Sequence, residues 1–170
     1  MKPNIEVPAI PRSALEKLLD AASVAVLLAA AVYLAVQWPS LPEQVPLHFN
    51  GRGEPDRWGT KITILFLPCI ALFLFGFMSM LRKFPSALNV PVAVTPDNAE
   101  AVYRLSFQLL AWIKLEVVLL LCVILTGAVR SAQGSSDGLG LWLLPVVLSV
   151  FAVTIVVYTI RVRKVGRSRP

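Results

Sequence analysis

The sequence has little charge for its length. Only 15% of its 170 residues are Asp, Glu, Lys or Arg, whereas an average soluble domain has about a quarter. It has one histidine and two cysteines, and neither cysteine stands at a metal-ligand spacing from other ligand residues. These numbers leave too few side chains for a metal centre of the usual three or four ligands, so we expect no metal and no cofactor.

Catalytic motifs are also missing. The chain has no HExxH, GxSxG or Walker motif, no dinucleotide fingerprint, and no serine or cysteine close to His48. Nothing therefore supplies a nucleophile with a matched base, and we expect the protein not to be an enzyme.

Long uncharged runs dominate the sequence instead. Of all residues 56% are hydrophobic, and the mean hydropathy is +0.71. Because about 20 apolar helical residues cross a bilayer core, the runs predict an all-α integral membrane protein, a bundle of four transmembrane helices with a structured outer loop between the first two. The runs are Ala21–Trp38, Ile62–Leu81, Leu115–Val129 (with Glu116 near its start) and Leu141–Ile160. The first run is longer than the apolar stretch of a signal peptide and no small-residue cleavage site follows it, so we expect an uncleaved helix.

The basic residues predict the orientation. The net charge is +6, and most Lys and Arg residues lie before the first run, between the second and third, or after the fourth. Lys and Arg accumulate in cytoplasmic loops, so we expect both termini in the cytoplasm, in a bacterial cytoplasmic (inner) membrane. The basic tail then anchors the topology and contacts anionic lipid of the bilayer, and we expect no nucleic-acid partner.

A single membrane domain with nine segments follows from this topology. They are a cytoplasmic leader (1–17), a first span (18–38), an outer motif loop (39–61), a second span (62–81), a cytoplasmic linker and helix start (82–111), a third span (112–130), a second outer loop (131–140), a fourth span (141–160) and a basic cytoplasmic tail (161–170). Ser13 and Glu16 form a capping-box pattern at the start of the first helix. Thr95 and Pro96 predict the start of a long helix that ends near Val129.

Two patterns concern helix packing. Ala21, Ala25 and Ala29 recur at four-residue spacing, which lets helix backbones approach closely. We expect this stripe to pack within the bundle, with dimerisation as the alternative. Pro68 and Pro145 lie inside predicted spans, where each is expected to kink its helix.

Lys114 and Glu116 are the charges expected within the bilayer, where ionisable residues are candidates for function. Two residues apart on a helix, they point about 200° away from each other and are not a natural pair. We expect Lys114 to extend to the cytoplasmic headgroups beside Trp112. We expect Glu116 to face the bundle or to bond a neighbour, with a role in a transport path as the alternative.

The loop of residues 41–61, LPEQVPLHFNGRGEPDRWGTK, holds most of the polar chemistry. Alternating polar and apolar residues over 44–50 predict an extended segment, and the glycines at 51 and 53 predict a turn. His48, Asn50 and Asp56 are candidates for a small polar site around that turn, although a His48–Asp56 hydrogen bond that only fixes the loop is the simpler interpretation. Thr60 is expected to cap the second helix.

The same loop resembles the signature of a bacterial membrane domain of unknown function, P-x-x-[IV]-P-x-H-[FW]-N-x-x-G-x-P-D-x-[WY]-x-x-K. That domain forms the N-terminal part of the sporulation-delay toxin immunity (SdpI-like) proteins. The matching residues are Pro42, Val45, Pro46, His48, Phe49, Asn50, Gly53, Pro55, Asp56, Trp58 and Lys61. We take six of these as candidate ligand-binding residues, namely His48, Asn50, Gly53, Asp56, Trp58 and Lys61.

The resemblance implies protection against a secreted antimicrobial peptide, coupled to capture of a cytoplasmic repressor. The immunity proteins carry further membrane helices after the shared domain, whereas this chain ends soon after its fourth. The leading hypothesis is a non-enzymatic envelope sensor or immunity-like binding module. Its candidate partners are a secreted peptide or another envelope ligand, and a membrane or cytoplasmic protein. A small transporter component that uses Glu116 and a structural assembly subunit are the alternatives.

Overall fold

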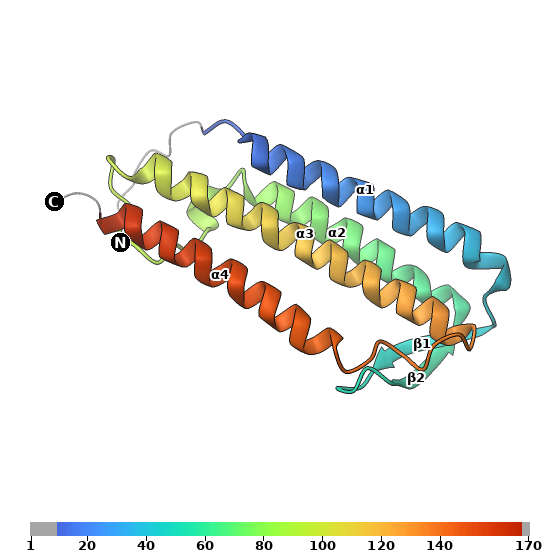
Figure 1. Ribbon diagram of the computed structural model, residues 1–170. Coiled ribbons are helices and arrows are strands. Elements are labelled where there is room, and N and C mark those ends of the chain that lie inside the picture. Colours follow the sequence, from blue (N-terminus) through green and yellow to red (C-terminus); the bar gives the residue numbers. More distant parts are fainter. Residues whose placement is uncertain (1–9, 168–170) are drawn as a thin grey trace.

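The computed structural model describes residues 10–167 and contains four long helices and one β-hairpin (Figure 1). Residues 1–9 and 168–170, which include Lys2 of the leader and Arg169 of the tail, lie outside the described residues. The elements are α1 (Ala14–Gln37), β1 (Gln44–Phe49), β2 (Pro55–Thr60), α2 (Phe66–Leu81), α3 (Ala99–Ala132) and α4 (Leu143–Arg167), with 3₁₀ turns at Trp38–Ser40, Lys61–Leu65 and Pro85–Ala87. The expected fold class, an all-α membrane bundle with an ordered loop, is confirmed.

α3 is the central helix of the bundle. It packs against α1, α2 and α4, whereas α4 packs mainly against α3 (Figure 1). The hairpin covers one end of the bundle, here called the hairpin end, and the start of α1 and the end of α4 lie at the other, the terminal end. A buried apolar cluster joins the helices beneath the hairpin, and it contains Ala30, Leu34, Leu41, Val45, Ile64, Leu125, Ala128 and Val129.

The outside of the bundle is apolar. Large side chains such as Leu28, Phe73 and Val153 are exposed on three different helices. An apolar surface of this extent is costly in water but suits hydrocarbon. Four helices are also long and apolar enough to cross a membrane. The protein is therefore a membrane protein.

The alanine stripe of α1 faces away from the bundle, so the expectation that it packs inside was wrong. Ala21, Ala25 and Ala29 are exposed. The buried positions of α1 are Glu16, Leu19, Ser23, Ala30 and Leu34. α1 is rotated so that this second row, which carries the larger Leu side chains, meets α3.

The helix starts agree only in part with the sequence patterns. At α1 the capping box is present, because the Ser13 hydroxyl accepts from the Glu16 amide and the Glu16 carboxylate accepts from the Ser13 amide. Thr60 makes no capping hydrogen bond, since a 3₁₀ turn rather than an α-helix follows it. α3 begins at Ala99, not at Pro96, because Thr95 and Asn98 close a separate turn first.

Neither Pro68 nor Pro145 interrupts a helix. Each is the third residue of its α-helix, Pro68 in α2 and Pro145 in α4. An amide in the first turn lacks a partner within its own α-helix, so a proline there costs little. The expected kinks were therefore wrong. α4 continues beyond the predicted fourth span, through the basic segment 161–167, to Arg167.

Candidate functional site

The hairpin places His48 next to Asp56. β1 and β2 pair antiparallel, from Gln44 opposite Thr60 to Phe49 opposite Pro55, and the register is irregular on both sides of His48. His48 Nδ1 lies 2.6 Å from Asp56 Oδ1, and both side chains are substantially exposed. An exposed pair of this kind contributes at most about 1 kcal/mol to stability. The predicted His–Asp hydrogen bond is confirmed.

Asn50 does not join that pair; it holds the turn. Its Oδ1 accepts from the amides of Arg52 and Glu54, and its Nδ2 donates to the Glu54 carboxylate. Gly53 closes the turn at φ +79°, a backbone conformation that glycine adopts freely. Asn50 therefore hydrogen-bonds within the turn and not to the His48–Asp56 pair.

The base of the hairpin is tied to the end of α1 through Lys61. Its Nζ donates to the Leu41 carbonyl at 3.2 Å and lies 4.9 Å from the centre of the Trp38 ring. The Lys61 amide also donates to the Glu43 carbonyl, which extends the strand ladder. Trp58 remains about half exposed. Lys61 therefore stabilises the base of the hairpin, at the opposite end from the turn.

The tip of the hairpin is docked on the loop before α4. The Leu139 amide donates to the Gly53 carbonyl at 2.7 Å. The backbones approach so closely that a side chain on Gly138 would meet the Gly53 carbonyl oxygen at 2.0 Å. The hairpin is thus held at its base by α1 and at its tip by the α3–α4 loop.

A cavity of about 550 Å³ lies beneath the docked hairpin. Its roof is residues 46–51 and 53, and its floor is mostly aliphatic side chains of the helices and the α3–α4 loop: Leu67, Leu120, Ile124, Ala128, Leu139, Leu143, Leu144 and Val147. Cavities of about 300–1,000 Å³ with apolar walls and a few polar groups are typical of small-ligand sites. Here His48 and Asn50 bring the polar groups. Of the six candidate binding residues, His48, Asn50 and Gly53 line this cavity, whereas Asp56, Trp58 and Lys61 do not.

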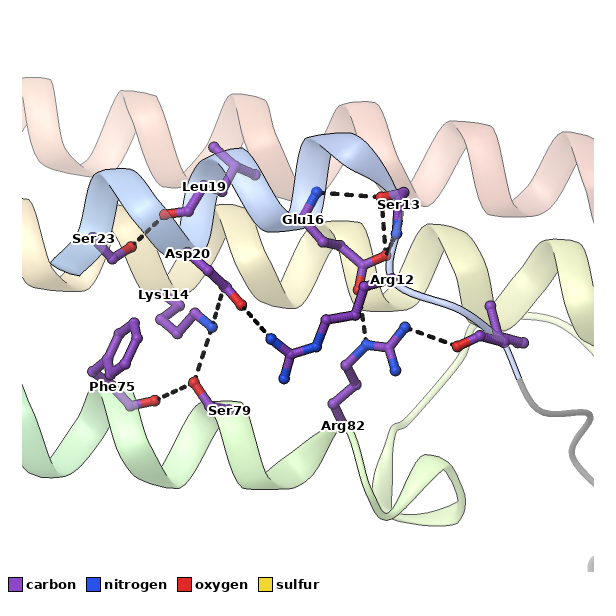
Figure 2. Close-up of polar contacts among 11 residues, drawn as sticks. Arg12, Ser13, Glu16, Leu19, Asp20, Ser23, Phe75, Ser79, Arg82 and Lys114 are labelled. Carbon is purple, nitrogen blue, oxygen red and sulfur yellow. Dashed lines mark hydrogen bonds and ion pairs between the residues drawn. The ribbon is translucent and has the colours of Figure 1, made fainter. Parts of the chain in front are cut away.

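A second polar region lies among α1, α2 and α3 toward the terminal end, and Lys114 is at its centre (Figure 2). Lys114 Nζ lies 2.5 Å from Asp20 Oδ1 and donates to Ser79 Oγ at 3.0 Å. It also stands 4.8 Å from the centre of the Phe75 ring. The Lys114 side chain is only 5% exposed. The expectation that it extends to the headgroups was wrong, because a carboxylate on α1 holds it inside the bundle.

Two further ion pairs continue this region toward the chain start. Arg12 Nη1 donates to Asp20 Oδ2 at 3.0 Å, so one carboxylate serves two cations. Arg82 Nε donates to Glu16 Oε2 at 2.8 Å, and Arg82 Nη2 donates to the Ile10 carbonyl. We call the five residues the ionic cluster: Arg12, Glu16, Asp20, Arg82 and Lys114.

Glu116 faces α4, on the other side of α3. It is 7% exposed. Thr154 Oγ1 donates to its Oε1 at 2.5 Å, and its Oε2 is buried with no hydrogen-bond partner among residues 10–167. Glu116 was expected to face the bundle or to bond a neighbour, and it does both.

Four members of the ionic cluster, Arg12, Glu16, Asp20 and Arg82, were not predicted as site residues. Glu16 was interpreted only as a capping residue, Arg12 and Arg82 only as basic residues that set the orientation, and Asp20 was given no role within the first span (18–38). A usable signal was present, since Asp20 directly precedes the first uncharged run and Lys114 stands near the start of the third. Two opposite charges at the same depth in neighbouring helices are candidates for a pair.

The hairpin, the cavity and the buried charges define a small multi-pass membrane protein with a ligand-sized site at one end. Residues 25–72 match the family described as a domain of unknown function (DUF1648), a segment that covers much of α1, the hairpin and the start of α2. The chain is 30% identical over 105 residues to an uncharacterized protein of Archaeoglobus fulgidus, which covers 56% of this chain and 55% of that protein. The chain thus spans about half the length of this curated relative, and because the relative is archaeal, similar chains are not confined to bacteria. No solved structure matches the chain.

Proposed function

We propose that the protein is a non-enzymatic binding module of the cell envelope, and that its ligand occupies the cavity beneath the hairpin. This proposal rests on an overlap between the signature residues of the outer loop and the residues that line the cavity. Five signature residues, Pro46, His48, Phe49, Asn50 and Gly53, also line the cavity. The other six signature residues do not line the cavity, and two of them, Asp56 and Lys61, make contacts that hold the hairpin fold.

The chemistry of the cavity favours an amphipathic ligand. Its floor is aliphatic and lies mostly on membrane-spanning helices, while the polar residues His48 and Asn50 belong to its roof. A membrane-active peptide has both properties, because it places apolar side chains in the bilayer and keeps its polar groups at the surface. A secreted peptide of this class also agrees with the resemblance to the immunity proteins. In this proposal the hairpin faces away from the cytoplasm, as the distribution of Lys and Arg predicts.

Filling the cavity is expected to abolish protection against such a peptide. Val147 lines the cavity on α4, so Val147→Trp places an indole where the ligand would bind. Leu148→Trp is the matched control, because the neighbouring Leu148 is 60% exposed on the outside of α4 and does not line the cavity. The measurement is growth of expressing cells under a panel of amphipathic membrane-active peptides.

We expect wild type and Leu148→Trp to protect against at least one peptide, and Val147→Trp to protect against none. Equal membrane levels of the three proteins must be verified by immunoblot. The proposal is overturned if cells with and without the wild-type protein are equally sensitive throughout the panel, or if Val147→Trp protects as well as Leu148→Trp does.

A second candidate function is transport, and the buried carboxylate of Glu116 favours it. An ionisable group inside a membrane bundle is a common element of a proton or ion path, and Glu116 Oε2 has no partner among the described residues. Under this hypothesis Glu116→Gln abolishes an ion flux in reconstituted vesicles. Glu100→Gln, which changes an exposed carboxylate on the same helix, leaves the flux unchanged. An absence of flux in the wild type would exclude this function.

A further inference from the structure

A long groove runs along the outside of the bundle between α1 and α2. It has a volume of about 590 Å³ and is separate from the cavity beneath the hairpin. Ala21, Val24, Ala25 and Leu28 of α1 form one wall, and Phe75 and Ser79 of α2 form the other. The groove exists because the exposed alanines of α1 have no bulk to fill it. It lies in the membrane-spanning part of both helices, so lipid chains surround it.

One end of this groove is charged. Arg12 and Asp20 line it there, and the Lys114 ammonium lies just behind Asp20 (Figure 2). An apolar trough that ends in ionised groups has the shape of a phospholipid, with a chain along the trough and a headgroup at its end. A purely apolar partner helix would remove the solvent from these ionised groups and supply no polar group in its place.

The charges of the ionic cluster do not cancel. It contains three cations, Arg12, Arg82 and Lys114, and two carboxylates, Glu16 and Asp20. Arg82 and Glu16 neutralise each other, whereas Asp20 is shared between Arg12 and Lys114. One positive charge therefore remains at the end of the groove. In a medium of low dielectric constant such an excess attracts an anion strongly.

Arg12 is placed to receive that anion. Its side chain is 48% exposed, whereas that of Lys114 is 5% exposed. Among residues 10–167 it donates to Asp20 through Nη1, which leaves the N–H groups of Nε and Nη2 for another acceptor. A guanidinium binds phosphate oxygens in a two-point geometry that an ammonium does not provide.

We propose that the groove between α1 and α2 is a binding site for an anionic phospholipid, with one acyl chain along Ala21, Ala25 and Leu28 and the headgroup phosphate against Arg12. The excess charge selects an anionic over a zwitterionic headgroup. Alanine at positions 21 and 25 leaves room for an acyl chain, which a larger side chain would fill.

Native mass spectrometry with equal amounts of phosphatidylglycerol and phosphatidylcholine of identical acyl chains tests this site. We expect the wild type to retain phosphatidylglycerol preferentially. Arg12→Gln should lower that preference about fivefold, the factor associated with one basic group at a membrane surface. Lys17→Gln is the matched control, because it removes an exposed cation five residues further along the chain, outside the groove and the cluster.

A second variant tests the groove itself. Ala25→Phe fills it and should reduce retention of both lipids, while the Arg12 end stays intact. Equal retention of the two lipids by wild type, or equal preference in Arg12→Gln and Lys17→Gln, overturns the proposal. Displacement of the lipid by inorganic phosphate would show that a free anion is bound instead. A lipid-free dimer that Ala25→Phe dissociates would show that a second copy occupies the groove.

Discussion

Replacing Asp20 with Asn is expected to destabilise the folded bundle by about 3–5 kcal/mol, the cost of leaving one partner of a buried ion pair without its counterion. Asp20 supplies the carboxylate that contacts Lys114 at 2.5 Å, and the Lys114 side chain is 5% exposed. Without Asp20, the ammonium keeps only the Ser79 hydroxyl and the Phe75 ring. A shift of the unfolding transition in an SDS titration of the micellar protein measures this loss.

Two further variants distinguish the contribution of the Asp20–Lys114 ion pair to stability from that of side-chain packing. Lys114→Met should cost clearly less than Asp20→Asn, because Asp20 then keeps its contact with Arg12. The double variant Asp20→Asn/Lys114→Met should recover most of the stability, since a buried ion pair replaced on both sides is often neutral. A double variant as unstable as the sum of the two single changes would contradict a direct interaction between Asp20 and Lys114.

Gly138→Ala is expected to release the hairpin tip and to cost about 2–4 kcal/mol. The new Cβ would lie 2.0 Å from the Gly53 carbonyl oxygen and 3.2 Å from the Glu54 Cα, and neither backbone atom can move without displacing the hairpin. The change also places alanine at φ +144°, a region that is strained for a side chain. Loss of the Leu139–Gly53 hydrogen bond adds to the cost. Hydrogen exchange should accelerate at residues 136–142.

Gly134→Ala is the control for backbone strain alone. Gly134 has φ +69°, and an added Cβ would meet nothing within 4 Å. Its replacement should cost about 1–2 kcal/mol and leave exchange at residues 136–142 unchanged. If both variants lose the same stability and exchange alike, the docking of the hairpin on the α3–α4 loop contributes nothing.

Much of the architecture could be predicted from the sequence, because the signals are local. A helix of about 20 uncharged, mostly apolar residues is stable in the hydrocarbon core of a bilayer. All four runs form helices in the structure. The capping box at Ser13 and the turn after Asn50 also depend only on neighbouring residues. The His48–Asp56 pair follows from hairpin pairing over eight positions.

The failures concern how the helices are rotated about their axes. Hydropathy in a membrane span does not distinguish a lipid-facing position from a buried one, because lipid chains are as apolar as a protein interior. The alanine stripe of α1 was therefore placed on the wrong face. The same rotation brings Asp20 into contact with Lys114, which is 94 positions away in the sequence. This contact keeps the Lys114 side chain buried within the bundle. The cavity could not be predicted either, since it depends on how far α4 stands from α2.

Through its two attachments, the hairpin links the end of α1 to the start of α4. Its base is fixed to the end of α1 by Lys61, and its tip is fixed to the start of α4 by the Gly53–Leu139 hydrogen bond. α4 has its main packing contacts with α3, and the hairpin adds an attachment just before its first turn. A change in hairpin tilt would be magnified along the 25 residues of α4 and would appear as a lateral displacement of Arg167 at the opposite end.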